Sequence, residues 1–232
     1  MRFLLTNDDG IYAQGLSALY RELSQAAECI VVAPEVEQSA VGHAITISRP
    51  LMVRKARKNG TFLGYAVAGT PADCVKIGLG ELACGPVDLV VSGINRGANV
   101  GINVLYSGTV SAATEAAIQG VPSLAISLDT RQDADFGPAA RFARKLAAFL
   151  LEHPLPQVAL NVNVPAIPEE KIRGVAVVKQ GRARLMENFD RRIDPRENIY
   201  YWLAGETEFP ASENEESDGS ALKQGWITIT PI

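Results

Sequence analysis

Histidine, cysteine and long apolar runs are scarce in this sequence of 232 residues, and each scarcity excludes a class of protein. The two histidines, His43 and His153, are too few for a histidine-rich zinc centre. The three cysteines show no C-x-x-C spacing, which argues against a disulfide framework and predicts reduced thiols. No apolar stretch approaches the length of a membrane span, and the first residues lack the apolar core of a signal peptide. We therefore expect a cytoplasmic protein that does not act at a membrane.

An excess of positive charge is also missing. The chain carries 22 basic and 26 acidic residues, a net charge of −4. Proteins that bind the phosphate backbone of a nucleic acid usually present a basic surface, so a nucleic acid polymer is not the expected partner. The hydrophobic fraction of 47% and the charged fraction of 21% are ordinary for a globular enzyme. The length suits one domain with a substantial core.

Apolar runs alternate with segments of helical periodicity along most of the chain. The run Phe3–Leu5 is followed by apolar residues at helical spacing over 16–23 and then by the apolar run Cys29–Ala33, which predicts a β-α-β unit. Unbroken apolar runs are typical of strands buried on both faces. We therefore predict an α/β fold, a three-layer, Rossmann-like, mostly parallel sheet with helices on both faces. Further strands are expected at 88–92, 122–127, 158–164 and 175–178, and an antiparallel pair at 44–56 and 61–68 beside the main sheet. Helices are expected around 70–82, 109–119 and 142–150, and a loop is expected at 93–108.

The pattern weakens beyond Gly181. Arginines alternate with acids and apolar residues, and Tyr200–Leu203 has the composition of a strand, so we predict a projecting β-hairpin arm. Its aromatics favour a contact with another subunit, and the alternative is a solvated, salt-bridged arm. Residues 206–218 hold six acids and a proline and are expected to form a mobile loop. The predicted organisation is a single domain over 1–232, with a core at 1–181, the arm and acidic loop at 182–225 and a closing strand at 226–232.

Two adjacent acids, Asp8 and Asp9, directly follow the first expected strand. Neighbouring carboxylates at the mouth of a buried strand repel each other and lose solvation, and a bound cation relieves both effects. Ligands of open parallel sheets bind at the carboxyl ends of the strands, where Ser39 and Asn95 are also expected. Two carboxylates, a hydroxyl and an amide oxygen suit Mg²⁺, Mn²⁺ or Ca²⁺ better than zinc. The alternative is a solvated turn closed by Gly10.

A second polar cluster, at 106–110, opens a helix of small residues. The free N–H groups and the positive dipole of a helix start favour an anion, and Gly108 allows a phosphate to approach the backbone. Ser107 and Thr109 add hydroxyl donors, although both residue types also cap helices without binding any ligand. The loop 95–101 contributes two asparagines and an arginine between this cluster and the acids. No Walker A motif or dinucleotide fingerprint occurs.

Five motifs, in order, resemble the SurE (survival protein E) family of metal-dependent nucleoside monophosphate phosphatases. They are LTNDDGI at 5–11, AP at 33–34 with QSAVG at 38–42, GTPADCV at 69–75, SGINRGAN at 92–99 and YSGTVSAA at 106–113. The resemblance implies one divalent ion per subunit, Mg²⁺ or Mn²⁺ with Ca²⁺ as another occupant, held by Asp8, Asp9, Ser39 and Asn95. It implies a phosphate site at Asn95, Ser107, Gly108 and Thr109, and catalytic roles for Asp8, Asp9, Asn99 and Ser107.

The resemblance also implies the reaction and the assembly. The expected substrates are nucleoside 5′- and 3′-monophosphates, with short polyphosphate as a further one, and the expected assembly is a homodimer or homotetramer built partly from the C-terminal arm. Residues 100–106 are the candidate segment for selecting the base. Because the adjacent acids lack the D-x-D spacing of phosphatases that form an aspartyl phosphate, we expect direct attack by water held at the metal.

Two other functions remain open at this point. A receiver-type phosphoacceptor module also binds Mg²⁺ through an acidic pair after its first strand. It needs a further aspartate after the central strand, where this chain has Ser92-Gly93-Ile94-Asn95. A non-catalytic nucleotide-binding regulator is the third alternative, and the intact acidic pair argues against it.

Overall fold

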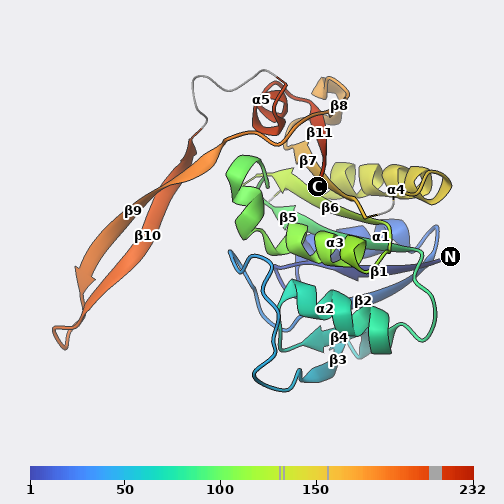
Figure 1. Cartoon of the computed structure of the whole chain (residues 1–232), viewed down its shortest axis with the longest axis horizontal. Coiled ribbons are helices and arrows are strands. Elements are labelled where there is room, and N and C mark those ends of the chain that lie inside the picture. The colour runs from blue at the N-terminus through green and yellow to red at the C-terminus, as the bar shows by residue number, and fades with distance from the viewer. Residues whose placement is uncertain (131, 133, 156, 209–215) are drawn as a thin grey trace.

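The computed structural model describes residues 1–130, 132, 134–155, 157–208 and 216–232, and a nine-stranded sheet forms its centre (Figure 1). The strand order is β3-β4-β2-β1-β5-β6-β7-β11-β8. β1 (Arg2–Thr6) pairs in parallel with β2 (Glu28–Pro34) on one side and with β5 (Leu89–Arg96) on the other. The parallel arrangement continues through β6 (Ser123–Asp129) and β7 (Ala159–Pro165). The predicted mostly parallel sheet is therefore confirmed.

The two edges of the sheet contain its antiparallel pairs. β4 (Thr61–Val67) lies parallel to β2, and β3 (Val53–Lys58) is antiparallel to β4, so this pair extends the main sheet instead of lying beside it. At the other edge, β11 (Ile227–Pro231) is antiparallel to β7 and parallel to β8 (Val175–Val177).

The strand expected to begin at residue 44 begins only at Val53. The reason lies in Thr46, whose N–H and hydroxyl donate to the Asp73 carboxylate at 2.9 and 2.7 Å. These bonds hold the segment before β3 against the start of a helix, away from the sheet. Burial raises the pKa of Asp73, but the hydrogen bonds that its carboxylate accepts from Thr46 and Thr70 outweigh burial and lower the pKa below its ordinary value.

Helices cover both faces of the sheet, which makes three layers (Figure 1). α1 (Gln14–Leu23) and α4 (Gly137–Glu152) pack on one face in the larger apolar cluster. α2 (Pro71–Ile77) and α3 (Gly108–Ile118) pack on the other face in a second cluster. Thr70 caps α2 as predicted, with Asp73 completing a capping box, and η1 (Gly78–Leu82), a short π-helix, continues α2.

The segment expected as one long loop, 93–108, is more ordered than predicted. β5 continues to Arg96, and η2 (Gly101–Tyr106) forms a 3-10 helix before α3. A shift in the register between β5 and β6 at Gly93 allows the strand to continue. Gly93 has a φ of 141°, and a Cβ there would come within 2.3 Å of the Ile126 carbonyl oxygen, so only glycine fits.

The C-terminal arm is a two-stranded antiparallel hairpin of β9 (Arg184–Ile193) and β10 (Ile199–Glu208), and it projects from the core (Figure 1). The prediction of a hairpin is confirmed. Directly paired residues of an antiparallel ladder share a face, so Phe189, Ile193, Ile199 and Leu203 lie on the same side of the arm. All four side chains are more than half exposed.

The end of the acidic segment differs from the expected mobile loop. Residues 209–215 lie outside the described residues, but Asp218 begins a helix, α5 (Asp218–Lys223), and is fully buried. Its carboxylate accepts the N–H groups of Gly101 and Gly181, each at 2.9 Å. Asp218 therefore ties the start of η2 to the base of the arm. The short 3-10 helix η3 (Glu169–Lys171) precedes β8.

The three cysteines are free thiols, as predicted. Burial raises the pKa of the Cys29 thiol to about 12, which makes it unreactive at neutral pH. Within the part of the chain that the structure describes, none of the helices is both long and apolar enough to cross a membrane.

Candidate active site

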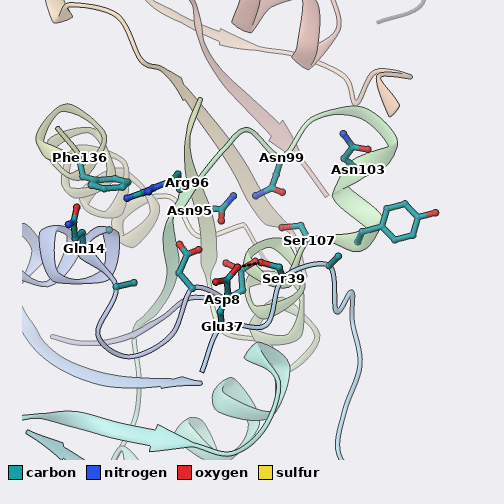
Figure 2. Close-up of a pocket in the computed structure, with 15 residues that line it drawn as sticks. Asp8, Gln14, Glu37, Ser39, Asn95, Arg96, Asn99, Asn103, Ser107 and Phe136 are labelled. Atoms are coloured by element: carbon teal, nitrogen blue, oxygen red, sulfur yellow. Dashed lines mark hydrogen bonds between the residues drawn. The ribbon is translucent and has the colours of Figure 1, made fainter. Parts of the chain in front are cut away.

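The loops that follow β1 and β2, the end of β5 and the start of α3 surround one cavity of about 550 Å³ (Figure 2). This edge of the sheet is where ligands of open α/β folds bind, because the loops after parallel strands meet there. Of the eight predicted site residues, the cavity is lined by Asp8, Asp9, Ser39, Asn95, Asn99 and Ser107. The structure thus brings together side chains that are up to 99 positions apart in sequence, Asp8 and Ser107.

Asp8 is held by the first turn of α3. The Thr109 N–H donates to one carboxylate oxygen of Asp8 at 3.1 Å, and the Thr109 hydroxyl donates to the other. Thr109 is fully buried and does not line the cavity. The structure therefore shows both donors of Thr109 directed at Asp8, and the phosphate contact expected from the sequence stays a prediction.

Gly108 also lies behind Asp8 and does not line the cavity. A Cβ at Gly108 would lie 2.8 Å from the Asp8 Cβ and 3.0 Å from the Pro71 ring. The glycine is thus required by the close approach of Asp8 to the helix start, whereas the sequence suggested close approach of a phosphate. The positive end of α3 already faces a carboxylate of the protein itself.

The acids of the cavity are in an environment that disfavours their charge. Burial raises the pKa of Asp8 above its ordinary value, although its hydrogen bonds to Thr109 oppose the shift. Burial first, and then the charges of Asp8 and Glu37, raise the pKa of Asp9 to about 6. Three carboxylates therefore face one small volume, and a cation would stabilise all of them.

Two neutral side chains present oxygen atoms to the same space. The Ser39 hydroxyl donates to the Glu37 carboxylate at 2.5 Å, so its oxygen lone pairs remain available for a ligand. The Asn95 amide nitrogen donates to the Gly97 carbonyl oxygen at 2.8 Å, which leaves the amide oxygen as the end that can bind a cation. Figure 2 shows Asn95 above the acids, with Ser39 and Glu37 close to Asp8.

The donor set fits a hard divalent cation. It consists of oxygens only, from two carboxylates, a hydroxyl and an amide, which is the chemistry that Mg²⁺ and Mn²⁺ prefer. Across the described residues there is no cluster of three or more histidine, cysteine, aspartate or glutamate side chains arranged to hold a metal. Only two of the four predicted metal ligands, Asp8 and Asp9, are of these residue types. A metal ion at this site would therefore also need the neutral oxygens of Ser39 and Asn95.

Ser107 and Asn99 also line this cavity, and both can donate a hydrogen bond into it. The Ser107 side-chain oxygen caps α3 by accepting the Val110 N–H at 3.1 Å, and its hydroxyl hydrogen is left for another acceptor. The Asn99 amide nitrogen donates one hydrogen to the Ser127 hydroxyl at 2.9 Å. A second hydrogen on that nitrogen can reach a ligand in the cavity.

Comparison with known proteins identifies the family. The model of the survival protein SurE family matches residues 3–187. A protein of Syntrophus aciditrophicus named 5′-nucleotidase SurE is 68% identical, and the match covers all of this chain and 88% of that protein. The chain belongs to the SurE family. A SurE relative from Syntrophobacter fumaroxidans is 52% identical over all of this chain and 93% of its own length. The crystal structure of a SurE protein from Aquifex aeolicus matches with a TM-score of 0.84 and 39% identity, over all of this chain and 93% of that one.

The site of this SurE chain contains supporting residues that the motifs did not reveal. Asn161 and Asn163 of β7 are fully buried, and both donate to the Asn99 carbonyl oxygen, at 2.8 and 3.0 Å. Asn163 also accepts the Asn99 N–H at 2.8 Å. These bonds fix the loop that carries Asn99. Two asparagines at alternating positions of an otherwise apolar strand are the sequence signal that could have identified them.

Glu37 is the other residue that sequence reasoning missed. It lies between the two parts of the second family motif, and its position two residues before Ser39 gave no sign that both side chains share the cavity. Only the turn of the chain after β2 places its carboxylate beside the acidic pair.

His43 connects two parts of the structure through a buried acid. Its Nε2 atom lies 2.9 Å from Glu115, a buried acid of α3 that also pairs with Lys76 at 2.9 Å. The ion pairs and hydrogen bonds outweigh burial and lower the pKa of Glu115. His43 does not line the cavity, and its contacts connect the loop after Ser39 to α2 and α3. His153 follows the last turn of α4 at the surface.

Proposed function

We propose that this chain is a metal-dependent phosphomonoesterase that hydrolyses nucleoside 5′- and 3′-monophosphates to nucleoside and phosphate, with short polyphosphate as a further substrate. The observation that carries this proposal is a single cavity in which two adjacent carboxylates meet neutral oxygen ligands and hydroxyl and amide donors. The relatives named 5′-nucleotidase SurE support the substrate class. A receiver-type module is not supported, because its phosphoacceptor aspartate has no counterpart among the residues of this cavity.

The side chains divide into two groups. Asp8, Asp9, Ser39 and Asn95 would hold one divalent ion, Mg²⁺ or Mn²⁺. When bound, such an ion activates water as a nucleophile and stabilises charge on the phosphoryl oxygens. The Ser107 hydroxyl and the Asn99 amide would donate to the phosphate, with Asn95 adjoining both groups. The carboxylate of Asp9 would accept the proton of the attacking water, because it lies in the same cavity as the proposed ion and the phosphate donors.

A phosphate-release assay tests the proposal. The protein is incubated with nucleoside 5′- and 3′-monophosphates and with short polyphosphate, first with EDTA and then with added Mg²⁺ or Mn²⁺. We expect release from nucleoside monophosphates only when a divalent ion is present, because the ion would activate the attacking water and stabilise charge on the phosphoryl oxygens. Release that is unaffected by EDTA would contradict the metal requirement. An absence of release from every nucleotide in the presence of metal would contradict the activity.

The pKa of Asp9 predicts how metal binding depends on pH. Because the folded-state pKa is raised from 3.8 to about 6, the Asp9 contribution to stability is fully present below pH 4 and is lost as the pH rises through 6. A bound metal ion would neutralise the ionised Asp9 carboxylate and so restore this stability. Below pH 6, however, the metal ion must compete with a proton for the carboxylate. The increase in melting temperature on adding Mn²⁺ should therefore be larger at pH 8 than at pH 5. Equal increases at both values would mean that Asp9 is not a ligand.

We also propose that the arm joins subunits into a homodimer or homotetramer. Phe189 and Leu203, paired across the hairpin, are 62% and 52% exposed, and an apolar face of this kind on a projecting hairpin favours association. The double variant Phe189→Asp/Leu203→Asp should sediment as a monomer. Asn188→Asp/Ala204→Asp places the same charges on the opposite face of the same strands and should keep the native mass. A monomeric wild type would overturn the assignment.

A further inference from the structure

A second cavity, of about 540 Å³, adjoins the active site. The two cavities share Gln14 and Phe136, so the second is a groove that opens directly beside the acids. Figure 2 shows Gln14 and Phe136 together on one side of Asp8, with Asn103 on the other side. The groove is separate from every residue to which the metal and phosphate are assigned above.

The floor of the groove is one face of α1. Gln14, Ser17, Ala18 and Arg21 are spaced i, i+3, i+4 and i+7, and all four line it. Seven residues of helix span about 10 Å, so the groove leads from the active site to a cationic end at Arg21. A ligand anchored at the acids could extend a sugar and a ring system along this floor.

The walls of the groove suit an aromatic ring with polar edges. Besides α1, the groove is lined by Tyr12, Lys58 and Leu63 and by the segment 134–136 before α4. Tyr12 is 58% exposed and lines the groove, and its hydroxyl donates to the Arg57 carbonyl oxygen at 3.5 Å. Arg21 and Lys58 supply donors of the kind that read the oxygen and ring-nitrogen acceptors of a base.

We propose that this groove binds the nucleoside part of the substrate, with Tyr12 as the stacking surface for the base. This inference rests on the proposed function, because it places the phosphate of the same molecule in the first cavity. Bases stack on aromatic faces with little dependence on their identity. The groove therefore provides affinity for nucleosides in general, with Gln14 beside the sugar and Arg21 and Lys58 at the edge of the base.

The sequence had suggested residues 100–106 for base selection, on the opposite rim. Tyr106 lies there and is 56% exposed, but it lines the first cavity and not the groove. The nucleoside could therefore extend from the acids either toward Tyr12 or toward Tyr106. Alanine variants of the two tyrosines distinguish these two orientations.

Binding measurements in the presence of Mn²⁺ test the proposal independently of catalysis. The probes are a phosphonate analogue of a nucleoside monophosphate, which has no ester bond to hydrolyse, and methylphosphonate, which has no nucleoside. Calorimetry gives the ratio of their dissociation constants for the wild type, Tyr12→Ala, Ser17→Trp and Tyr106→Ala. Ser17→Trp fills the middle of the groove from a half-buried position on α1.

We expect the nucleoside phosphonate to bind the wild type more tightly than methylphosphonate does. This advantage should fall by about tenfold or more in Tyr12→Ala, as expected for loss of a stacking contact, and in Ser17→Trp, and it should persist in Tyr106→Ala. The proposal is overturned if the wild type shows no advantage, if Tyr12→Ala and Ser17→Trp retain it, or if only Tyr106→Ala loses it. A protein that shows the expected binding pattern but releases no phosphate from nucleotides would retain the groove and lose the proposed function.

Discussion

The Asp9→Asn variant is expected to lose about a thousandfold or more in kcat/KM for a nucleoside monophosphate, because it loses both a charged metal ligand and the proposed proton acceptor. The same change should make the metal-free protein more stable at pH 7.5. At that pH the wild-type carboxylate is ionised, although burial and the charges of Asp8 and Glu37 raise its pKa to about 6. Asparagine has nearly the same shape and no charge, so it removes this repulsion.

The two opposite effects distinguish a functional acid from a structural one. Steady-state kinetics with saturating Mn²⁺ measures the loss of activity, and thermal unfolding in EDTA at pH 7.5 and pH 5 measures the stability. The gain in stability should shrink at pH 5, where Asp9 of the wild type is largely protonated. Glu35→Gln is the matched control, since Glu35 lies just after β2 in an exposed ion pair with Arg54. Near-normal turnover of Asp9→Asn with added Mn²⁺ would rule out both roles.

The architecture could be predicted because its signals are local. The central strands contain apolar runs such as Leu89–Val91, and a helix cap can be recognised from its residue types, as Thr70 and Asp73 show at α2. The rule that ligands bind at the carboxyl ends of parallel strands then places Asp8, Ser39 and Asn95 together without coordinates. The start of β3 was missed because it depends on Thr46, whose partner Asp73 is 27 positions away.

The supporting contacts of the site could not be predicted, because they depend on residues that meet only in the folded chain. Thr109 and Asp8 are 101 positions apart, and a threonine at a helix start has the same sequence signature whether it binds a phosphate, caps the helix or holds an acid. The role of Asp218 could not be predicted for the same reason. Six acids in a short segment indicate a solvated loop. In the folded chain, however, Asp218 is buried and accepts the N–H groups of Gly101 and Gly181.

Thr109→Val is expected to lower metal affinity or activity by about 10- to 100-fold, the usual effect of removing a residue that positions a metal ligand. Valine keeps the shape of threonine but cannot donate to the Asp8 carboxylate, which is 7% exposed and has few other donors to turn to. Leaving a buried acceptor without its partner also costs about 1–3 kcal/mol in the free energy of unfolding. The Thr109→Ser variant retains the hydroxyl and should recover most of both losses.

The pattern of losses decides between the two roles that sequence and structure suggest for Thr109. If it positions Asp8, then Thr109→Val weakens the Mn²⁺-dependent rise in melting temperature, and excess Mn²⁺ restores part of the activity. If it binds phosphate directly, inhibition by inorganic phosphate weakens while the response to Mn²⁺ stays as in the wild type. Because both donors of Thr109 are directed at Asp8 and the residue is fully buried, we expect the first pattern. The Asp8 carboxylate then depends on α3 for its geometry as much as on β1.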